Sequence, residues 1–505
     1  MYELIEVNTS KVIGDEIDGS IYQVREQIAN YNLKDYESEV TILVQTYNGL
    51  NKTKKCVESI LKTISGIDCD LWLIDNGSTD GTLEYFKNVE YEKKHIIRIN
   101  ENRGSTLPWD IFSAQMLSKY VVIVAGDLVF TENWLSNMIT IAKSDNKIGM
   151  INPVSSNVSN FQQIDFEFND EDEMHKIIKR FNISNPQKWH ERLRIVTLGT
   201  LFTKECLYAI GIPLHDVGFI HNFGDDDITF RVRRAGYKAI LAGDTWIHHD
   251  HEKRNCTIEQ AQKINNDLAI GRQNFREKYF GIDAWDDVNN FIPEILPLIK
   301  PPVDKDNCNI LGIDVRCGTP ILEIKNHLRQ YDIFDATCCA VTSEGKYFID
   351  LQTFCGADNV FACSPADASE HFKQEVFDYI IIGENINEYP EPFRIIKHVY
   401  SLLKKGGQMF VYLKNNYDIY TFLNVIGHRQ VRPTKASLNL TIEQFLEQHL
   451  NMDIKAEVAG VIPYTNVPEE YINEVNNKTA AFVQDEWSET AARLTADRFI
   501  VKIER

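Results

Sequence analysis

Polar residues follow three apolar runs near the start of the chain, at the points where those runs end. These are the segments 45–48 (Gln-Thr-Tyr-Asn), 75–81 (Asp-Asn-Gly-Ser-Thr-Asp-Gly) and 125–127 (Ala-Gly-Asp). Side chains of these types can hydrogen-bond a nucleotide if the fold brings the three run ends together. For segment 75–81 alone, a turn that leads to a helix N-cap also explains the composition, because such turns favour Asn, Gly, Ser and Asp.

Alternating strands and helices are expected to position these segments. Apolar runs at 40–44, 71–74, 96–99 and 120–124 predict strands, and apolar residues between 57 and 64 have helical spacing. Parallel strands joined by helices place their carboxyl ends along one edge of the sheet, where ligands bind. The sequence therefore predicts an α/β domain whose polar segments converge at that edge.

A proline-rich stretch separates this series from a second one. It contains prolines that break helices and favour extended backbone, namely Pro293, Pro297, Pro301 and Pro302. Further strand-like runs follow at 310–313, 379–382, 409–413 and 499–503. We therefore expect an N-terminal extension (1–38), a first domain (39–284), a proline-rich linker (285–307) and a second domain (308–505).

The composition narrows the class of partner. The chain has 73 Asp and Glu against 53 Lys and Arg, a formal charge of −20 that repels nucleic acid and anionic lipid. An acidic cleft that holds a divalent cation fits this balance.

No run reaches the roughly 18 apolar residues of a membrane span. The start of the chain is acidic, unlike a secretory signal, so we expect a cytoplasmic protein. The ten cysteines lack paired Cys-x-x-Cys spacing and are expected to be mostly buried thiols.

Taken in order, the polar segments resemble the family 2 glycosyltransferases of the GT-A fold, a Rossmann-like fold that binds a nucleotide-diphosphate sugar. Residues 44–48 match the family's first strand and Thr-Tyr-Asn turn, and 75–81 match its Asp-Asn-Gly-Ser-x-Asp-Gly segment in full. Residues 102–104 match its Asn-x-Gly, whereas 105–110 depart from the small-residue helix that usually follows. The resemblance covers about residues 39–275. It implies donor contacts from Thr46, Asn48, Asp75, Asn76, Asn102, Gly104, Gly126 and Asp127.

The resemblance also implies a metal site for Mn or Mg. The family's motif of two acids flanking one residue is here 125–127, where only the second acid, Asp127, is present. A cation that bridges two phosphates needs few protein ligands, so one carboxylate can suffice. His249 fits the register of a histidine that ligates the metal, and a shift by one would select His248. For His248 and His251 we expect a solvated loop instead, and capping of a helix near Glu132 is the alternative for Asp127.

An acidic helix start supplies the expected catalytic base. Residues 223–237 resemble the family's Glu-Asp-x-Asp helix opening, and the register makes Asp225 the general base. Such a base takes the proton from the acceptor hydroxyl as its oxygen attacks the anomeric carbon. Acids at a helix start also cap it, so we assign capping mainly to Asp226 or Asp227, with Asp227 as reserve base. The segments 197–202 and 216–219 lie where the family builds its acceptor side.

Residues 308–505 resemble a class I S-adenosylmethionine methyltransferase domain through the segments 313–320, 377–381 and 402–407. Arg316 and Pro320 occupy two of the three glycine positions at which backbone must approach the cofactor. The second strand, near 336–341, lacks a clear acid for the ribose. We therefore expect a degenerate domain that does not use S-adenosylmethionine and instead binds a partner or supports the transferase.

These resemblances together imply an inverting hexosyltransferase that moves one sugar, expected to be GlcNAc from UDP-GlcNAc, to a hydroxyl. A family 2 transferase fused to a methyltransferase-like domain resembles bacterial enzymes that O-glycosylate flagellin, which implies a protein Ser or Thr as acceptor. Three alternatives stay open. They are a polysaccharide or rhamnosyl-type transferase, a bifunctional glycosyl- and methyltransferase, and a non-catalytic sugar-nucleotide or partner-binding scaffold.

Overall fold

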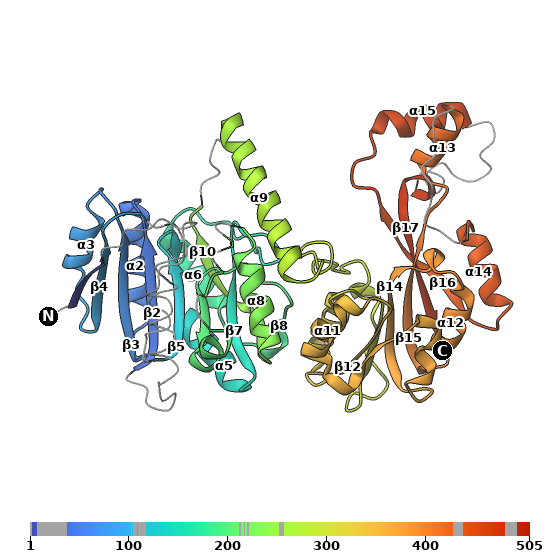
Figure 1. Cartoon of the computed structure of the whole chain (residues 1–505), viewed down its shortest axis with the longest axis horizontal. Helices are drawn as coiled ribbons and strands as arrows, with labels where there is room; N and C mark the ends of the chain where they lie inside the picture. Colours follow the sequence, from blue (N-terminus) through green and yellow to red (C-terminus); the bar gives the residue numbers. More distant parts are fainter. Residues whose placement is uncertain are drawn as a thin grey trace. The chain divides into compact units, whose positions relative to one another are not determined.

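Two compact units make up the chain, residues 1–289 and 290–505 (Figure 1). The computed structural model describes residues 3–7, 38–102, 104, 109, 118–211, 214–216, 218–219, 222–251, 257–427, 438–479 and 492–505. Most of the expected N-terminal extension, residues 8–37, lies outside the described residues. None of the helices within these ranges is long and apolar enough to cross a membrane.

A ten-stranded sheet forms the centre of the first unit. Its order is β1-β4-β3-β2-β5-β9-β7-β10-β6, and β8 pairs with β10 off this path. Strands β1 to β5 run parallel, whereas β9 is antiparallel to both β5 and β7. The strands are β1 (Glu3–Val7), β2 (Ser38–Thr46), β3 (Cys69–Asn76), β4 (Lys94–Ile99), β5 (Ser118–Ala125), β6 (Leu128–Val129), β7 (Ile148–Ser155), β8 (Trp189–Glu191), β9 (Thr200–Thr203) and β10 (Lys238–His249). The four predicted strands of the first domain are thereby confirmed.

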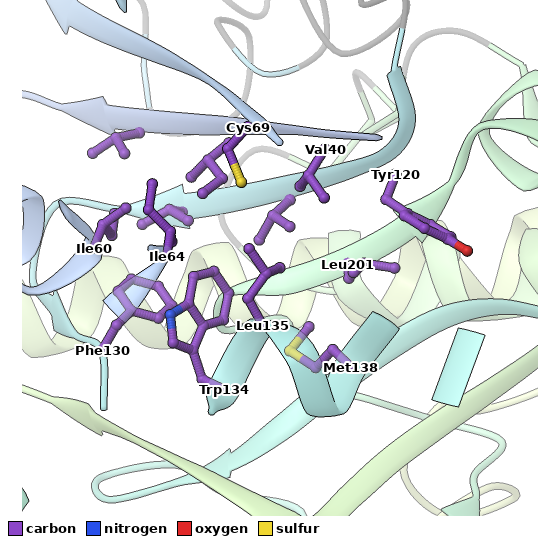
Figure 2. Packing of buried hydrophobic residues seen from close by; sticks show 14 of the residues in the cluster. Val40, Ile60, Ile64, Cys69, Tyr120, Phe130, Trp134, Leu135, Met138 and Leu201 are labelled. Atoms are coloured by element: carbon purple, nitrogen blue, oxygen red, sulfur yellow. The ribbon is translucent and has the colours of Figure 1, made fainter. Parts of the chain in front are cut away.

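Helices cover both faces of this sheet. They are α2 (Leu50–Thr63), α3 (Thr82–Asn88), α5 (Trp134–Ser144), α6 (Glu171–Phe181), η1 (Pro186–Lys188), α7 (Lys204–Ile210), α8 (Gly224–Arg234) and α9 (Ile258–Lys278). Because side chains alternate across a strand, Val40, Ile42 and Val44 of β2 enter one core cluster and Leu43 enters another. Figure 2 shows the first cluster, in which Trp134 of α5 packs against Phe130, with ring centroids 4.2 Å apart.

The pairing register brings the polar run ends together. Thr46 at the end of β2 pairs with Asp75 of β3, and Gln45 pairs with Ala125 of β5. The carboxyl ends of three neighbouring strands therefore meet at one edge, as the alternation of strands and helices predicted.

The second unit is built on a seven-stranded sheet of order β13-β12-β11-β14-β15-β17-β16. Its strands are β11 (Asn309–Ile313), β12 (Thr337–Thr342), β13 (Val360–Ala362), β14 (Phe377–Asn385), β15 (Leu403–Lys414), β16 (Ala456–Pro463) and β17 (Ala496–Glu504). All neighbours are parallel except that β17 is antiparallel to β15 and β16. The strand order reverses between β11 and β14, which is the switch point of a doubly wound sheet. The predicted α/β class with two Rossmann-like domains is confirmed.

Helices of the second unit connect these strands. They are η2 (Leu296–Leu298), α10 (Thr319–Leu328), η3 (Arg329–Tyr331), η4 (Gly345–Tyr347), α11 (Phe348–Cys355), η5 (Ala357–Asn359), η6 (Pro365–Glu370), η7 (Ile386–Glu388), α12 (Pro392–Tyr400), α13 (Ile419–Ile426), α14 (Ile442–Leu450) and α15 (Glu469–Thr479). The proline-rich segment expected as a linker is packed from residue 290 onward. Ile292, Ile295 and Ile299 are buried, and the Lys300 amide donates to Gln408 Oε1 of β15 at 2.8 Å.

Candidate active site

A cavity of about 670 Å³ opens where β2, β3 and β5 end, a volume typical of small-molecule sites. It is lined by Gln45, Thr46, Tyr47, Asn48, Gly49, Lys52, Thr53, Asn76, Asn102, Gly104, Trp109, Ala125, Gly126, Asp127 and His251. Seven of the eight donor-contact residues that the resemblance implied are in this list, and Asp75 is not. The structure thus gathers residues from five separate segments around one cleft.

Hydrogen bonds tie the two polar turns of the cleft to each other. The Asn48 amide donates to Ser78 Oγ at 2.8 Å, and the Thr79 amide donates to Asn48 Oδ1 at 3.0 Å. Asp80 accepts from the Leu50 amide at 2.9 Å, so the turn after β3 also holds the start of α2. Segment 75–81 therefore shapes the cleft by holding its backbone.

Asp75 lies beneath the cleft and is not one of its lining residues. Its side chain is fully buried, forms an ion pair with Arg98 of β4, and accepts from the Ser78 amide at 2.8 Å. Arg98 also donates to the Ser78 carbonyl at 3.1 Å. Asp75 thus supports the turn that carries Ser78, and its expected nucleotide contact stays a prediction. Arg98 was missed by the sequence reasoning, although a charged residue inside the apolar run 96–99 is itself a signal.

Two amides organise the opposite wall. Asn76 Nδ2 donates to Asn102 Oδ1 at 3.0 Å and to the Gly104 carbonyl at 2.6 Å. Asn102 Oδ1 also accepts from the Gly104 amide at 2.9 Å. At the floor, a Cβ on Gly126 would lie 2.9 Å from Thr46 Oγ1, so this position has no room for a side chain.

Three side chains are placed to hold a cation at one end of the cleft. Asp127, His249 and His251 each offer a ligand atom, and these atoms lie within 4.8 Å of one another. His249 Nε2 is 3.5 Å from Asp127 Oδ2. A carboxylate and two imidazoles form a donor set that suits Mn²⁺ and related ions. The residues present therefore fit the cation that the resemblance implied.

His251 is the residue of this group that the sequence reasoning placed on a solvated loop. The chain turns directly after β10, where the His251 amide donates to the His249 carbonyl at 2.8 Å. The two imidazole centroids are consequently 5.0 Å apart. The His-x-His spacing was the available signal, but the turn that returns His251 to the cleft is not visible in the sequence.

A fixed backbone clamp orients His249. Its Nδ1 lies 3.0 Å from the Asn157 carbonyl, and Asn157 Nδ2 donates to the His249 carbonyl at 2.9 Å. This leaves Nε2 to face Asp127, as neighbouring groups commonly do for a metal-binding histidine. Burial lowers the pKa of His249, but the Asp127 carboxylate outweighs burial and the pKa is raised overall. Burial raises the pKa of Asp127, and His249 more than offsets this, so that pKa is lowered.

His248 has a different environment, which settles the choice of register between the two histidines. Its Nδ1 pairs with Ser156 Oγ at 2.9 Å, and its ring stacks on Trp246. Burial lowers its pKa. Asp127 does not act as the cap of the following helix, because α5 begins at Trp134 with Asn133 as its N-cap.

The three acids at the start of α8 have three different partners. Asp225 is partly buried and accepts a hydrogen bond from Thr197 Oγ1. Burial raises the pKa of Asp225, although Thr197, His215 and Arg194 act against this. Asp226 forms an ion pair with Arg194, and burial raises its pKa to about 6 despite that partner.

Asp227 is fully buried in a cluster with Arg231, Lys278 and Tyr279. The N-cap residue of α8 is Phe223, which has no side-chain capping bond. The structure therefore corrects the capping assignment of Asp226 and Asp227, because both carboxylates are held by cationic side chains. Both carboxylate oxygens of Asp227 have partners in this cluster, and its role as reserve base stays a prediction.

Two aromatic rings link Asp225 to the cleft. Trp109 lines the cavity, and its ring stacks on His215 with centroids 6.1 Å apart. His215 Cδ2 lies 3.3 Å from where a Cβ of Gly224 would be, directly before Asp225. The cavity's described lining does not include Asp225 itself.

The switch point of the second sheet is occupied by the chain's own side chains. Arg316, at a φ of 54°, follows β11 and forms an ion pair with Glu384 of β14 at 2.7 Å. Asp314 accepts from the Ser343 amide at 2.6 Å and from Tyr389 Oη at 2.9 Å. A cofactor loop needs backbone that a ligand can approach. These residues therefore do not fit S-adenosylmethionine.

We expect His251→Ala and His249→Ala each to weaken Mn²⁺ binding at least about tenfold, because each removes one of three protein ligands. Titration of Mn²⁺ followed by electron paramagnetic resonance measures this. His248→Ala is the matched control, since its ring contacts Ser156 and Trp246. Equal losses in all three variants would contradict the three-residue site.

Gly77→Ala should destabilise the turn after β3 more than an ordinary left-handed glycine substitution. Gly77 has a φ of 83°, and an added Cβ would lie 2.5 Å from the Glu101 carbonyl carbon. Gly66 has the same φ of 83° with open space around it, so Gly66→Ala is the control. We expect about 1 kcal/mol for Gly66→Ala and roughly 2 kcal/mol more for Gly77→Ala in denaturant unfolding. Equal costs would show that the close backbone approach is absent.

Comparison with known proteins finds a family model that matches part of the chain. Residues 41–199 match the model of Glycosyl transferase family 2. One similar solved structure is a mannosyltransferase from Pyrobaculum calidifontis in complex with GDP-Man and Mn²⁺, at 17% identity and a TM-score of 0.33. The match covers 46% of this chain and 64% of that one, so less than two thirds of its length is spanned.

A second similar structure is a SAM dependent methyltransferase from Archaeoglobus fulgidus, at 17% identity and a TM-score of 0.28, covering 46% of this chain and 99% of that one. No curated protein matches the chain. The family match spans β2 to the residue before β9 and includes most of the described cleft. The match to the model of Glycosyl transferase family 2 therefore falls within the first unit.

Proposed function

We propose that the first unit is an inverting glycosyltransferase that moves one sugar from a nucleoside-diphosphate sugar to a hydroxyl. One observation carries the proposal: a single cleft joins the hydrogen-bonding ends of β2 and β3 to a set of three cation ligands. A nucleoside and a diphosphate need these two kinds of group side by side. Thr46, Asn48, Asn76 and Asn102 are assigned to the nucleoside end.

Asp127, His249 and His251 would hold the divalent cation. When bound, that cation stabilises negative charge on the departing diphosphate. Asp225 accepts the proton of the acceptor hydroxyl while the hydroxyl oxygen forms a bond to the anomeric carbon and the bond to the diphosphate breaks. A single displacement of this kind inverts the anomeric centre. Because burial raises the pKa of Asp225, it is a stronger base than an exposed aspartate, and the rate should fall as the pH drops through that raised pKa.

For the substrates, we propose UDP-GlcNAc as donor and a Ser or Thr of a bacterial protein such as flagellin as acceptor. The support is the order of sequence motifs and their fusion to a methyltransferase-like domain. Incubation with UDP-, GDP- and dTDP-sugars, Mn²⁺ and candidate acceptors, read by intact-protein mass spectrometry, tests both. Transfer to oligosaccharide but not to protein would instead support the polysaccharide-type reading.

Asp225→Asn should lower kcat by about 10²–10⁴-fold with little change in donor binding, because the amide keeps the size and removes the base. Initial rates at saturating donor, together with donor titration, measure the two effects. Asp227→Asn is the control: it disturbs the cluster with Arg231 and Lys278 and should lower thermal stability more than kcat. An unchanged kcat in Asp225→Asn would overturn the base assignment.

For the second unit, we propose a supporting or partner-binding role without methyl transfer. The proposal is supported by the Arg316–Glu384 ion pair and the Tyr389–Asp314 hydrogen bond, which lie beside the loop after β11. Saturating S-adenosylmethionine should therefore leave the melting temperature of the full chain unchanged. A nucleoside diphosphate with Mn²⁺ serves as the positive control, because a ligand at a hundredfold excess over Kd adds about 2.7 kcal/mol. Stabilisation by S-adenosylmethionine would favour the bifunctional reading.

A further inference from the structure

Lys52, in the first turn of α2, is a cleft residue with no role so far. Its side chain lines the cavity together with Asp127 and His251, and it is the one Lys or Arg among the described lining residues. Its Nζ donates to the Asp250 carbonyl at 2.6 Å. That carbonyl belongs to the residue between the two histidines of the cation site. The ammonium group therefore stands beside the cation ligands.

The ammonium group is only partly engaged by protein. It carries three N–H donors. One donates to the Asp250 carbonyl, and Asp250 Oδ1 at 3.8 Å is too far for a second hydrogen bond. Asp250 forms an ion pair with Lys52 at this distance, and the first turn of α2 contains no acidic residue. Donors on Lys52 thus remain available, among the described residues, to a ligand that enters the cleft.

The charge of the cleft indicates which kind of ligand would accept hydrogen bonds from the N–H donors of Lys52. Asp127 is the one acid in the described lining, since Ala125 stands where the resemblance placed a second acid. A divalent cation on Asp127 and two neutral imidazoles leaves this end of the cleft positive, and Lys52 increases that positive charge. A diphosphate carries negative charge on both phosphates and matches this arrangement. Ammonium groups are common phosphate ligands in proteins.

We infer that Lys52 binds the diphosphate of the sugar donor, and of the nucleoside diphosphate left after transfer, next to the cation site. The inference rests on the proposed function, because it requires a nucleotide sugar in the cleft. Without donor, the bond to the Asp250 carbonyl keeps the ammonium at the cation ligands. With donor, its remaining N–H groups donate to phosphate oxygens.

Lys52→Met tests the inference, with Lys55→Met as matched control. Lys55 lies one turn further along α2, outside the described cavity lining, and pairs with Glu171 at 2.7 Å. Calorimetric titration with UDP, GDP and dTDP in the presence of Mn²⁺ gives the diphosphate affinity. Lys52→Met should weaken it about 10–100-fold, the effect of one hydrogen bond between charged groups. Lys55→Met should match the wild type, and Lys52→Arg should retain most of the affinity.

Two further measurements distinguish a contact of Lys52 with the diphosphate from an effect of Lys52 on Mn²⁺ binding. Mn²⁺ affinity without nucleotide should stay within about twofold in Lys52→Met, and nucleoside monophosphates should lose less affinity than diphosphates. An equal loss for Mn²⁺ alone, or unchanged diphosphate affinity in a folded Lys52→Met, would overturn the inference. If the wild type with Mn²⁺ binds no nucleoside diphosphate at all, the proposed function itself fails.

Discussion

The register of three parallel strands is the constraint on which the rest of the first unit depends. Pairing of Thr46 with Asp75 and of Gln45 with Ala125 makes β2, β3 and β5 end at the same level. A slip by one residue would send each strand's side chains to the opposite face and would exchange Leu43 with Ile42 and Val44 between the two core clusters. The cleft therefore follows from how the core packs. Residues far apart in the chain reach it because their strands end there.

Several residues of the cleft region both stabilise the fold and shape the site. The buried pair of Asp75 and Arg98 is one case, since loss of either partner would leave an uncompensated buried charge, at a cost of about 3–5 kcal/mol. The clamp of Asn157 on His249 is another. Lys52 connects α2 to the segment after β10 across 198 residues of sequence. Of these contacts, the clamp on His249 is the one that holds a candidate cation ligand in place.

The two units show how one type of fold can carry different sites. Both have a parallel sheet with an edge at which ligands commonly bind. In the first unit that edge is open and lined by hydrogen-bonding groups. In the second, Arg316 after β11 forms an ion pair with Glu384 of β14 at the switch point. The site, and not the fold, therefore decides what each unit does.

The sequence alone determined the alternation of strands and helices, the α/β class, and the segments that meet in the cleft. Those features depend on local periodicity and on motifs a few residues long. Only the tertiary structure decided that Asp75 is buried beneath the turn, that Asp226 and Asp227 are held by cations, and that His251 joins Asp127 and His249. Each of these depends on contacts with residues distant in sequence, or on a turn whose direction the residue types do not specify. Burial and ion pairing are set by such neighbours, and they control what a carboxylate or an imidazole can do.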